Sequence, residues 1–263
     1  MLNQRHFFPH ENSLCRLAVY LLLCALWLPV NARAALEIMA EDDAAPWAQR
    51  DGRGAAVDIV KAAFAAANVK LVIHTVVYAR CKHMVLNGEI AACFSMSADA
   101  SIADKVVFSD QPLYRVYAQY FRNAQKPLPV KNETEIQRGT VVGIVTGYEY
   151  PASVTELALR GVILEPAGSE IANLKKLAAG RIDATVANLD ALKSEEFLTQ
   201  AAHVEGAVTP LFRSPEFGSY IGFSTLHPQG LWARDKFNEG YDRISRDGTL
   251  KKIMTRWQSL QHK

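Results

Sequence analysis

Long apolar runs are scarce in this chain of 263 residues. The one conspicuous run covers residues 17–30, about fourteen residues, whereas a membrane-spanning helix needs about 20. A basic segment precedes the run, and residues 32–34 follow it with the small-x-small spacing of a cleavage site. This pattern predicts a secretory signal peptide over residues 1–34, with a retained anchor as the alternative. We therefore expect an exported, periplasmic protein whose mature part begins near Ala35.

An excess of charge of one sign is also lacking. Residues 1–34 hold three of the 29 basic and one of the 27 acidic side chains, so 26 of each sign remain after them. The basic stripe that nucleic acids or membrane surfaces require is therefore missing, and we predict neither partner. The remaining length of about 229 residues is sufficient for two lobes of ordinary domain size.

Cysteine is rare as well, with four in the chain and only Cys81 and Cys93 beyond the predicted leader. Cys81 begins a predicted helix that ends near Asn87, and Cys93 lies on the strand that follows. Six helical steps cover about 9 Å and three returning strand steps about 10 Å, so the two cysteines reach the same level. A disulfide in an oxidising compartment is one interpretation, and two buried thiols are the other. No histidine or further cysteine has the spacing of a zinc site, and we predict no metal and no cofactor.

Apolar periodicity predicts strands that alternate with helices, which is typical of parallel α/β sheets. Two phrases are nearly repeated: GEIAACFSM at residues 88–96 and GRIDATVAN at residues 180–188. Each follows a helical pattern, and each has a glycine where a helix ends and a strand begins. The repeat predicts two similar lobes. Extended segments at residues 114–122 and 207–224 connect them, so we assign one lobe to residues 35–118 and 218–263 and the other to 119–217. Ligands of such sheets bind beyond the carboxyl ends of the strands, here in a cleft between the lobes.

The ordered set of short motifs resembles the family 3 solute-binding proteins of ABC transporters, the type that captures polar amino acids. The matching pieces are PW at residues 46–47, VVFSDQPLY, GIVTGY, LAAGRIDATVAN, FSTLHP and the C-terminal FNEGYDRISRDGTLKKIMTRW. The resemblance implies a type II periplasmic-binding-protein clamshell, in which each lobe is a mainly parallel sheet flanked by helices and two hinge strands cross between the lobes. It further implies a monomer that captures a small polar solute for a membrane permease.

The resemblance also implies ligand-binding positions. Each has a plainer explanation: Glu41 as a solvated strand end, Tyr78 as part of the core, Arg80 as one half of a surface ion pair, and the serines as turn caps. The predicted set is Glu41, Tyr78, Arg80, Ser95, Met96, Ser97, Thr146, Gly147, Tyr148 and Asn188.

Three positions depart from the family pattern. The covering aromatic becomes Ala44, the arginine that holds a ligand carboxylate becomes Ile102, and the acid that receives an ammonium becomes Asn188. A carboxylate beside Ile102 loses a charge-assisted pair worth about 2–5 kcal/mol. Arg80 and Lys105 are the alternatives that could take the place of the missing arginine. We therefore expect a polar or anionic solute other than a standard amino acid. We predict that Arg80, Tyr78, Ser95, Ser97 and the free N–H groups of residues 146–148 hold it, just before a helix predicted from about Pro151.

Two other functions fit the same scaffold. Some relatives dehydrate a cyclic acid in this cleft, a reaction that needs a positioned carboxylic acid, and Glu41, Glu149 and Glu170 are the glutamates near the predicted cleft edge. A sensory or accessory binding module without its own permease is the other possibility. Because no histidine or nucleophile accompanies the glutamates, we predict a binding protein and not an enzyme.

Overall fold

The computed structural model describes residues 34–261, so the predicted signal peptide lies outside the described residues except for Ala34. The first lobe is built on three parallel strands: β4 (Leu71–Val76), β1 (Leu36–Glu41) and β5 (Ala92–Met96), in that order. Helices α2 (Ala55–Ala66), α3 (Tyr78–Leu86), α7 (Gly230–Arg246) and α8 (Thr249–Gln261) flank them. The short strands β2 (Asp43–Ala44) and β3 (Ala48–Gln49) form a hairpin, and η1 (Ala100–Ile102) precedes β6 (Val106–Phe108).

The second lobe repeats this plan. Its parallel strands are β9 (Ile163–Ala167), β8 (Val141–Val145) and β10 (Ala184–Leu189), and β11 (Val208–Arg213) lies off this path. The helical segments are η2 (Glu133–Glu135), α4 (Ala152–Thr155), η3 (Ala158–Arg160), α5 (Glu170–Ala178) and α6 (Glu195–Ala202). The predicted α/β clamshell is confirmed, and the exact bounds of its lobes stay a prediction.

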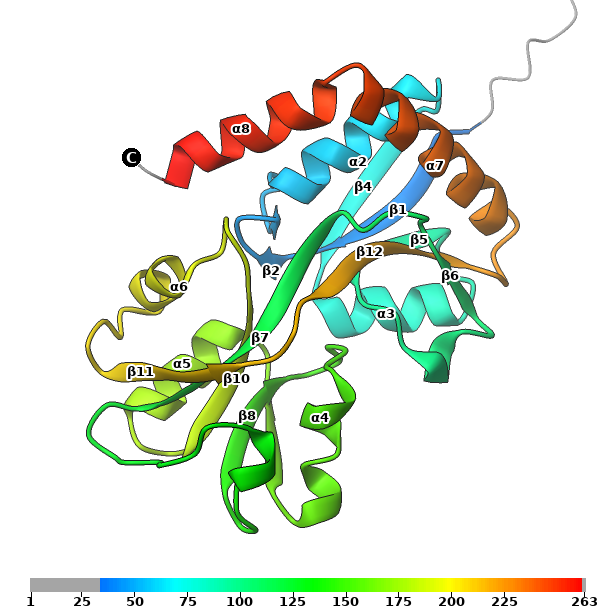
Figure 1. Ribbon diagram of the computed structural model, residues 1–263. Helices are drawn as coiled ribbons and strands as arrows, with labels where there is room; N and C mark the ends of the chain where they lie inside the picture. Colours follow the sequence, from blue (N-terminus) through cyan, green and yellow to red (C-terminus); the bar gives the residue numbers. More distant parts are fainter. Residues whose placement is uncertain (1–33, 262–263) are drawn as a thin grey trace, which may run out of the picture. The chain divides into compact units, whose positions relative to one another are not determined.

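Two extended strands connect the lobes, and they are easily followed in Figure 1 as the green β7 (Tyr114–Asn123) and the orange β12 (Phe217–Ser224). β7 pairs antiparallel with β10 and β11 in the second lobe, and β12 pairs with β5 and β6 in the first. The two crossing strands also pair with each other, from Phe217 opposite Val116 to Ser219 opposite Tyr114. These crossings are the segments whose backbone rotation can part the lobes.

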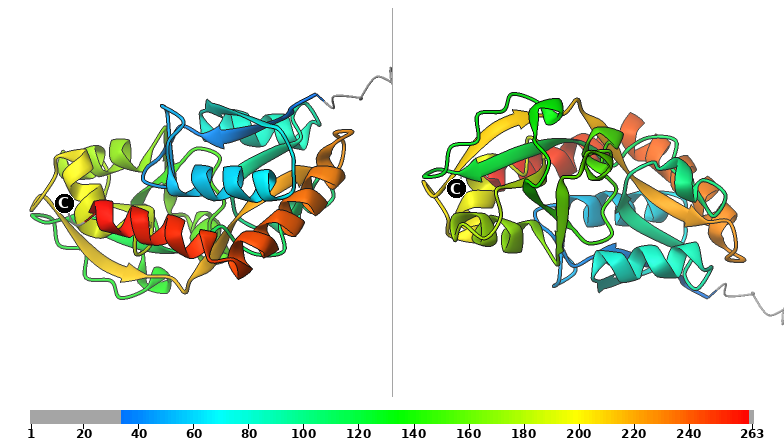
Figure 2. Two further views of the ribbon diagram at one scale, coloured as in Figure 1. Left: turned by 90° about the horizontal axis from the view of Figure 1, so that it is seen from above. Right: turned by 90° about the horizontal axis from the view of Figure 1, so that it is seen from below.

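The C-terminal chain returns to the first lobe, as predicted. Helix α7 packs against α2, and α8 follows it on the same side of the lobe (Figure 2). Gly240 allows the close approach of α7 to α2, because a Cβ there would lie 1.8 Å from the Ala63 carbonyl oxygen. Phe237 and Ile244 of α7 are buried in the same apolar core as Val60 and Phe64 of α2.

The repeated phrases form equivalent parts. Gly88 (φ +74°) and Gly180 (φ +67°) adopt the left-handed conformation just after α3 and α5, which terminates each helix. β5 and β10 follow, and both run toward the space between the lobes. The predicted disulfide is confirmed: Cys81 of α3 is bonded to Cys93 of β5, with their Cα atoms 5.7 Å apart.

One local expectation was missed and another is confirmed. Helix α6 was not predicted; Ser194 begins it by accepting a hydrogen bond from the Phe197 N–H. The helix predicted from about Pro151 is confirmed, since α4 begins at Ala152, and Gly147 (φ +86°) turns the chain between β8 and α4. In the part of the chain that the structure describes, no helix is long and apolar enough to span a membrane.

Candidate functional site

A cavity of about 30 Å³ lies between the lobes, where the strands of both sheets end. A cavity of this size holds about two water molecules. The end of β1, the β2–β3 hairpin and the segment after β5 line it from the first lobe, and the segments after β8 and β10 line it from the second. The lining residues are Glu41, Ala44, Trp47, Ser95, Ser97, Tyr114, Val116, Tyr148, Glu149, Asn188, Asp190, Lys193 and Ser219.

Glu41, the last residue of β1, is buried and faces the second lobe. Its carboxylate accepts a hydrogen bond from the Tyr148 hydroxyl. Burial raises the pKa of Glu41 from 4.5 to about 8, although the hydrogen bond and the Lys193 charge oppose this shift. Glu41 is therefore a neutral carboxylic acid at pH 7. Burial, followed by the nearby Glu41 carboxyl, raises the pKa of Tyr148 well above its ordinary value, so its hydroxyl remains a donor.

A stacked pair of aromatic rings covers the cavity. The β2–β3 hairpin places Trp47 against Tyr114 at the start of β7, with the ring centroids 3.8 Å apart and the planes 10° from parallel. The Trp47 indole donates across the cleft to Asp190 Oδ2 at 2.6 Å. The other Asp190 oxygen accepts the backbone N–H groups of Leu192 and Lys193. Trp47 thus supplies the aromatic cover that Ala44 cannot.

The second lobe contributes a buried ion pair beside the cavity. Glu170, the first residue of α5, binds the Lys193 ammonium with one oxygen and accepts the Asn188 N–H at 2.6 Å with the other. Burial is the largest single effect and lowers the pKa of Lys193, but the charge and hydrogen bond of Glu170 together with the Glu41 and Asp190 charges outweigh it, and the pKa is raised. Lys193 is therefore charged but already paired. The Asn188 Oδ1 atom is buried and has no hydrogen-bond partner among the described residues.

Glu149 makes a third set of contacts between the lobes. It lies in the segment between β8 and α4, and its carboxylate is held entirely by first-lobe groups. Oε2 accepts from the Tyr78 hydroxyl at 2.5 Å and from the Ser97 N–H at 3.2 Å. Oε1 pairs with Lys82 Nζ at 2.7 Å.

The structure brings half of the predicted positions to the cavity: Glu41, Ser95, Ser97, Tyr148 and Asn188 line it. Ser95 adopts φ +74°, a conformation unusual for serine, where β5 leaves the sheet. Tyr78 lies behind the cavity wall and contacts it through Glu149.

The other four predicted positions do not line the cavity. Arg80 is exposed on α3, and Met96 is fully buried in an apolar core that also holds Ile102. Thr146 is exposed, and its N–H and hydroxyl both donate to the Ala167 carbonyl. The Tyr148 N–H donates to the Val145 carbonyl. Gly147 is not among the lining residues either, and its carbonyl accepts from Lys82 Nζ at 3.2 Å. The Thr146 and Tyr148 N–H groups already have backbone acceptors, which argues against the anion site predicted at residues 146–148.

Sequence reasoning missed several lining residues, namely Trp47, Tyr114, Asp190 and Lys193. Trp47 was noted as a family motif, but nothing in its spacing showed that a hairpin turns its ring inward. Asp190 and Lys193 directly follow the repeated phrase, and this position at a strand end was the available signal. Within residues 34–261, no group of three or more His, Cys, Asp or Glu side chains is arranged to hold a metal ion.

Two hinged α/β lobes that enclose a polar cavity define a solute-binding protein of the clamshell type. The chain belongs to the bacterial extracellular solute-binding proteins, family 3, whose model matches residues 36–260. No curated protein matches the sequence.

Several solved structures share the fold. A histidine kinase sensor domain with similarity to periplasmic binding proteins has a TM-score of 0.74 at 16% identity, covering 85% of this chain and 96% of its own. An ancestral arginine-binding protein bound to arginine has a TM-score of 0.70 at 19% identity, with 86% and 98% covered. The arginine-, lysine-, histidine-binding protein ArtJ from Geobacillus stearothermophilus has a TM-score of 0.69 at 14% identity, with 85% and 94% covered. At these identities the likeness concerns the fold alone.

Proposed function

We propose that this protein captures a small polar solute in the cavity between its lobes and delivers it to an ABC permease. The observation that supports this most directly is the composition of the cavity wall. Both lobes contribute polar groups, and hydrogen bonds join them across the cleft, donated by the Tyr148 hydroxyl to Glu41 and by the Trp47 indole to Asp190. A solute that touches both walls stabilises the closed arrangement and so couples binding to lobe closure.

The cavity wall favours a solute that donates hydrogen bonds. Asn188 presents a buried Oδ1 acceptor that has no partner among the described residues, whereas Lys193 is neutralised by Glu170 and Arg80 lies elsewhere on α3. This replaces the anionic solute expected from the sequence with a small polar molecule or a small cation. The volume of about 30 Å³ also requires the lobes to part before anything larger than two waters enters.

Solute capture is tested by a thermal-shift and calorimetry screen of amino acids, small amines and small organic acids. We expect binding of at least one polar solute, with a smaller radius of gyration in small-angle scattering when it is bound. Replacing Asn188 by Leu should weaken that binding about tenfold, because a hydrogen bond of about 1.4 kcal/mol is lost. Gln125→Leu removes an amide from an exposed loop of the second lobe and serves as the matched control.

Two results contradict this proposal. Equal affinities in the Asn188 and Gln125 variants would place the solute outside the cavity. Loss of binding in Arg80→Ala would instead support anion binding at Arg80 on α3. Delivery to a permease is tested separately by deleting the gene and measuring uptake of the identified solute. Unchanged uptake, together with loss of a transcriptional response to the solute, would indicate a sensory role instead.

A further inference from the structure

Three donors of the first lobe converge on one point, and the acceptor they share comes from the other lobe. Tyr78 and Lys82 lie one turn apart on α3, and Ser97 follows β5. Tyr78 Oη, Lys82 Nζ and the Ser97 N–H all reach the Glu149 carboxylate. Lys82 Nζ also donates to the Gly147 carbonyl, in the same second-lobe segment. Among the described residues, these three groups have no hydrogen-bond or ion-pair acceptor in the first lobe.

A hydroxyl and a backbone N–H that donate to one carboxylate oxygen, with an ammonium forming an ion pair at the other, make a carboxylate-binding site. The site is buried: Glu149 is 7% exposed and Tyr78 is 4% exposed. Burial, and then the Glu149 charge, raise the pKa of Tyr78 well above its ordinary value, which keeps its hydroxyl protonated as a donor. When the lobes part, Glu149 leaves with the second lobe, and all three donors remain without an acceptor.

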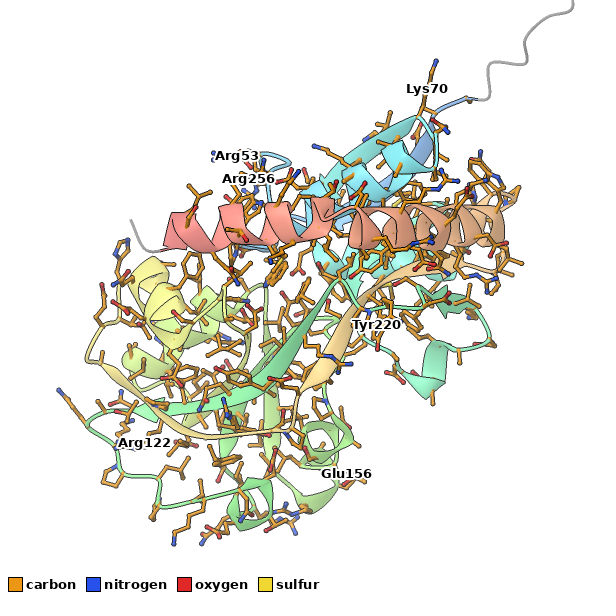
Figure 3. The ribbon with its side chains drawn as sticks, turned by 45° about the horizontal axis from the view of Figure 1, so that its top comes forward. Arg53, Lys70, Arg122, Glu156, Tyr220 and Arg256 are labelled. Carbon is orange, nitrogen blue, oxygen red and sulfur yellow. A yellow bond between two sulfur atoms is a disulfide. The ribbon has the colours of Figure 1, made fainter. Side chains whose placement is uncertain are left out.

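Glu149 also divides the space between the lobes. Together with Ser97 it lines the cavity of about 30 Å³ described above and a second cavity of about 180 Å³. The second cavity lies against the crossing strand β12 and is lined by Tyr220, which Figure 3 labels on that strand. Glu149 and Ser97 are therefore common to the linings of both cavities.

We infer that Glu149 is an internal ligand, which occupies a carboxylate-binding site formed by Tyr78, Lys82 and Ser97 on the first lobe. The closed form without solute is then held by the protein's own carboxylate. An external carboxylate takes this site only by displacing Glu149, whereas a solute without a carboxylate binds beside it.

The inference is tested by removing the internal ligand and supplying a small carboxylate. In Glu149→Ala the three donors lose their shared carboxylate, Lys82 keeps only the Gly147 carbonyl, and sodium acetate fits the vacated place. At ten times its Kd, acetate should raise the melting temperature of this variant by about 4 °C. Wild type, titrated with acetate over the same range, should change its melting temperature no more than it does with sodium chloride at the same ionic strength.

Two further variants separate this role from a simple ion pair between the lobes. Glu156→Ala removes an exposed carboxylate shortly after Glu149 in the sequence and should behave as wild type (Figure 3). Adding Lys82→Ala to Glu149→Ala should abolish the acetate response. If Glu149→Ala is too unstable, Glu149→Gln is titrated instead, because its amide cannot neutralise Lys82 and acetate should displace it.

The inference is overturned if acetate stabilises wild type and the Glu149 variant equally, or stabilises neither Glu149 variant. The experiment needs no knowledge of the natural solute. Failure of the acetate titration and failure of the transport proposal are therefore separate outcomes.

Discussion

Replacing Glu41 by Gln should change how the stability of this protein depends on pH. Glu41 is a buried acid whose pKa is raised to about 8 in the folded protein, against an ordinary value of 4.5. Between these values the unfolded chain has released the proton and the folded protein still holds it. Stability associated with this group is therefore fully present below pH 4.5 and is lost as the pH rises toward 8.

The magnitude follows from the two pKa values. Each pH unit between them costs about 1.4 kcal/mol, so the full interval costs about 5 kcal/mol. Glutamine is nearly isosteric, and its amide oxygen can accept the Tyr148 hydroxyl as Glu41 does. The variant should therefore keep the fold and gain up to about 5 kcal/mol relative to wild type from pH 4.5 to pH 8. In wild type, the ionised Glu41 carboxylate can also be hydrated by separation of the lobes without unfolding. The stability gained by Glu41→Gln therefore cannot exceed the free energy of opening the lobes.

The assay is thermal unfolding of both proteins at unit steps from pH 5 to pH 9. Only the difference between their melting temperatures matters, because other titrating groups contribute equally to both. That difference should grow by up to about 8–16 °C between pH 5 and pH 8, at about 2–4 °C per kcal/mol for a chain of this size. Glu156→Gln, at an exposed position, is the control and should follow wild type. Parallel curves for wild type and Glu41→Gln would refute the reasoning.

Two further predictions concern the disulfide and the approach of the lobes. Free-thiol titration of the denatured exported protein should find no thiol, and replacing Cys81 and Cys93 by Ser should cost about 3 kcal/mol in chemical denaturation; an unchanged midpoint would contradict this. Gly147→Ala should open the cleft and raise the radius of gyration, because its Cβ would lie 3.2 Å from Ala79 Cα in the other lobe. Gly139→Ala, with φ +84° and nothing within 4 Å, incurs the same left-handed backbone cost of about 1–2 kcal/mol and should not open the cleft; an equal radius in both variants would argue against contact there.

Local signals explain what the sequence predicted well. Alternating strands and helices, and glycines that end α3 and α5, depend on residues close together in the chain. The disulfide could be predicted for the same reason, since Cys81 and Cys93 lie 12 residues apart on adjacent elements. The two lobes and their crossing strands followed from the repeat of these local patterns.

The predictions that failed concern the backbone between helices and strands. The anion site at residues 146–148 assumed free N–H groups before the helix predicted from about Pro151, but the Thr146 and Tyr148 N–H groups donate to the carbonyls of Ala167 and Val145. Helix α6 lacks a strong apolar run, and Ser194 marks its start only once the loop before it is placed. Arg80 was assigned to the cleft because α3 begins there, yet helical rotation turns Tyr78 inward and leaves Arg80 exposed.

The pairing of side chains across the cleft was decided by tertiary structure alone. Tyr78 and Glu149 are 71 positions apart, and Trp47 and Asp190 are 143 apart. No periodicity joins such positions, because each pair forms only where the two lobes close on each other. The sequence by itself determined the lobes and the strand ends that face one another. Which carboxylate meets which donor depends on the rotation of one lobe against the other about β7 and β12, and that rotation is a property of the packed molecule.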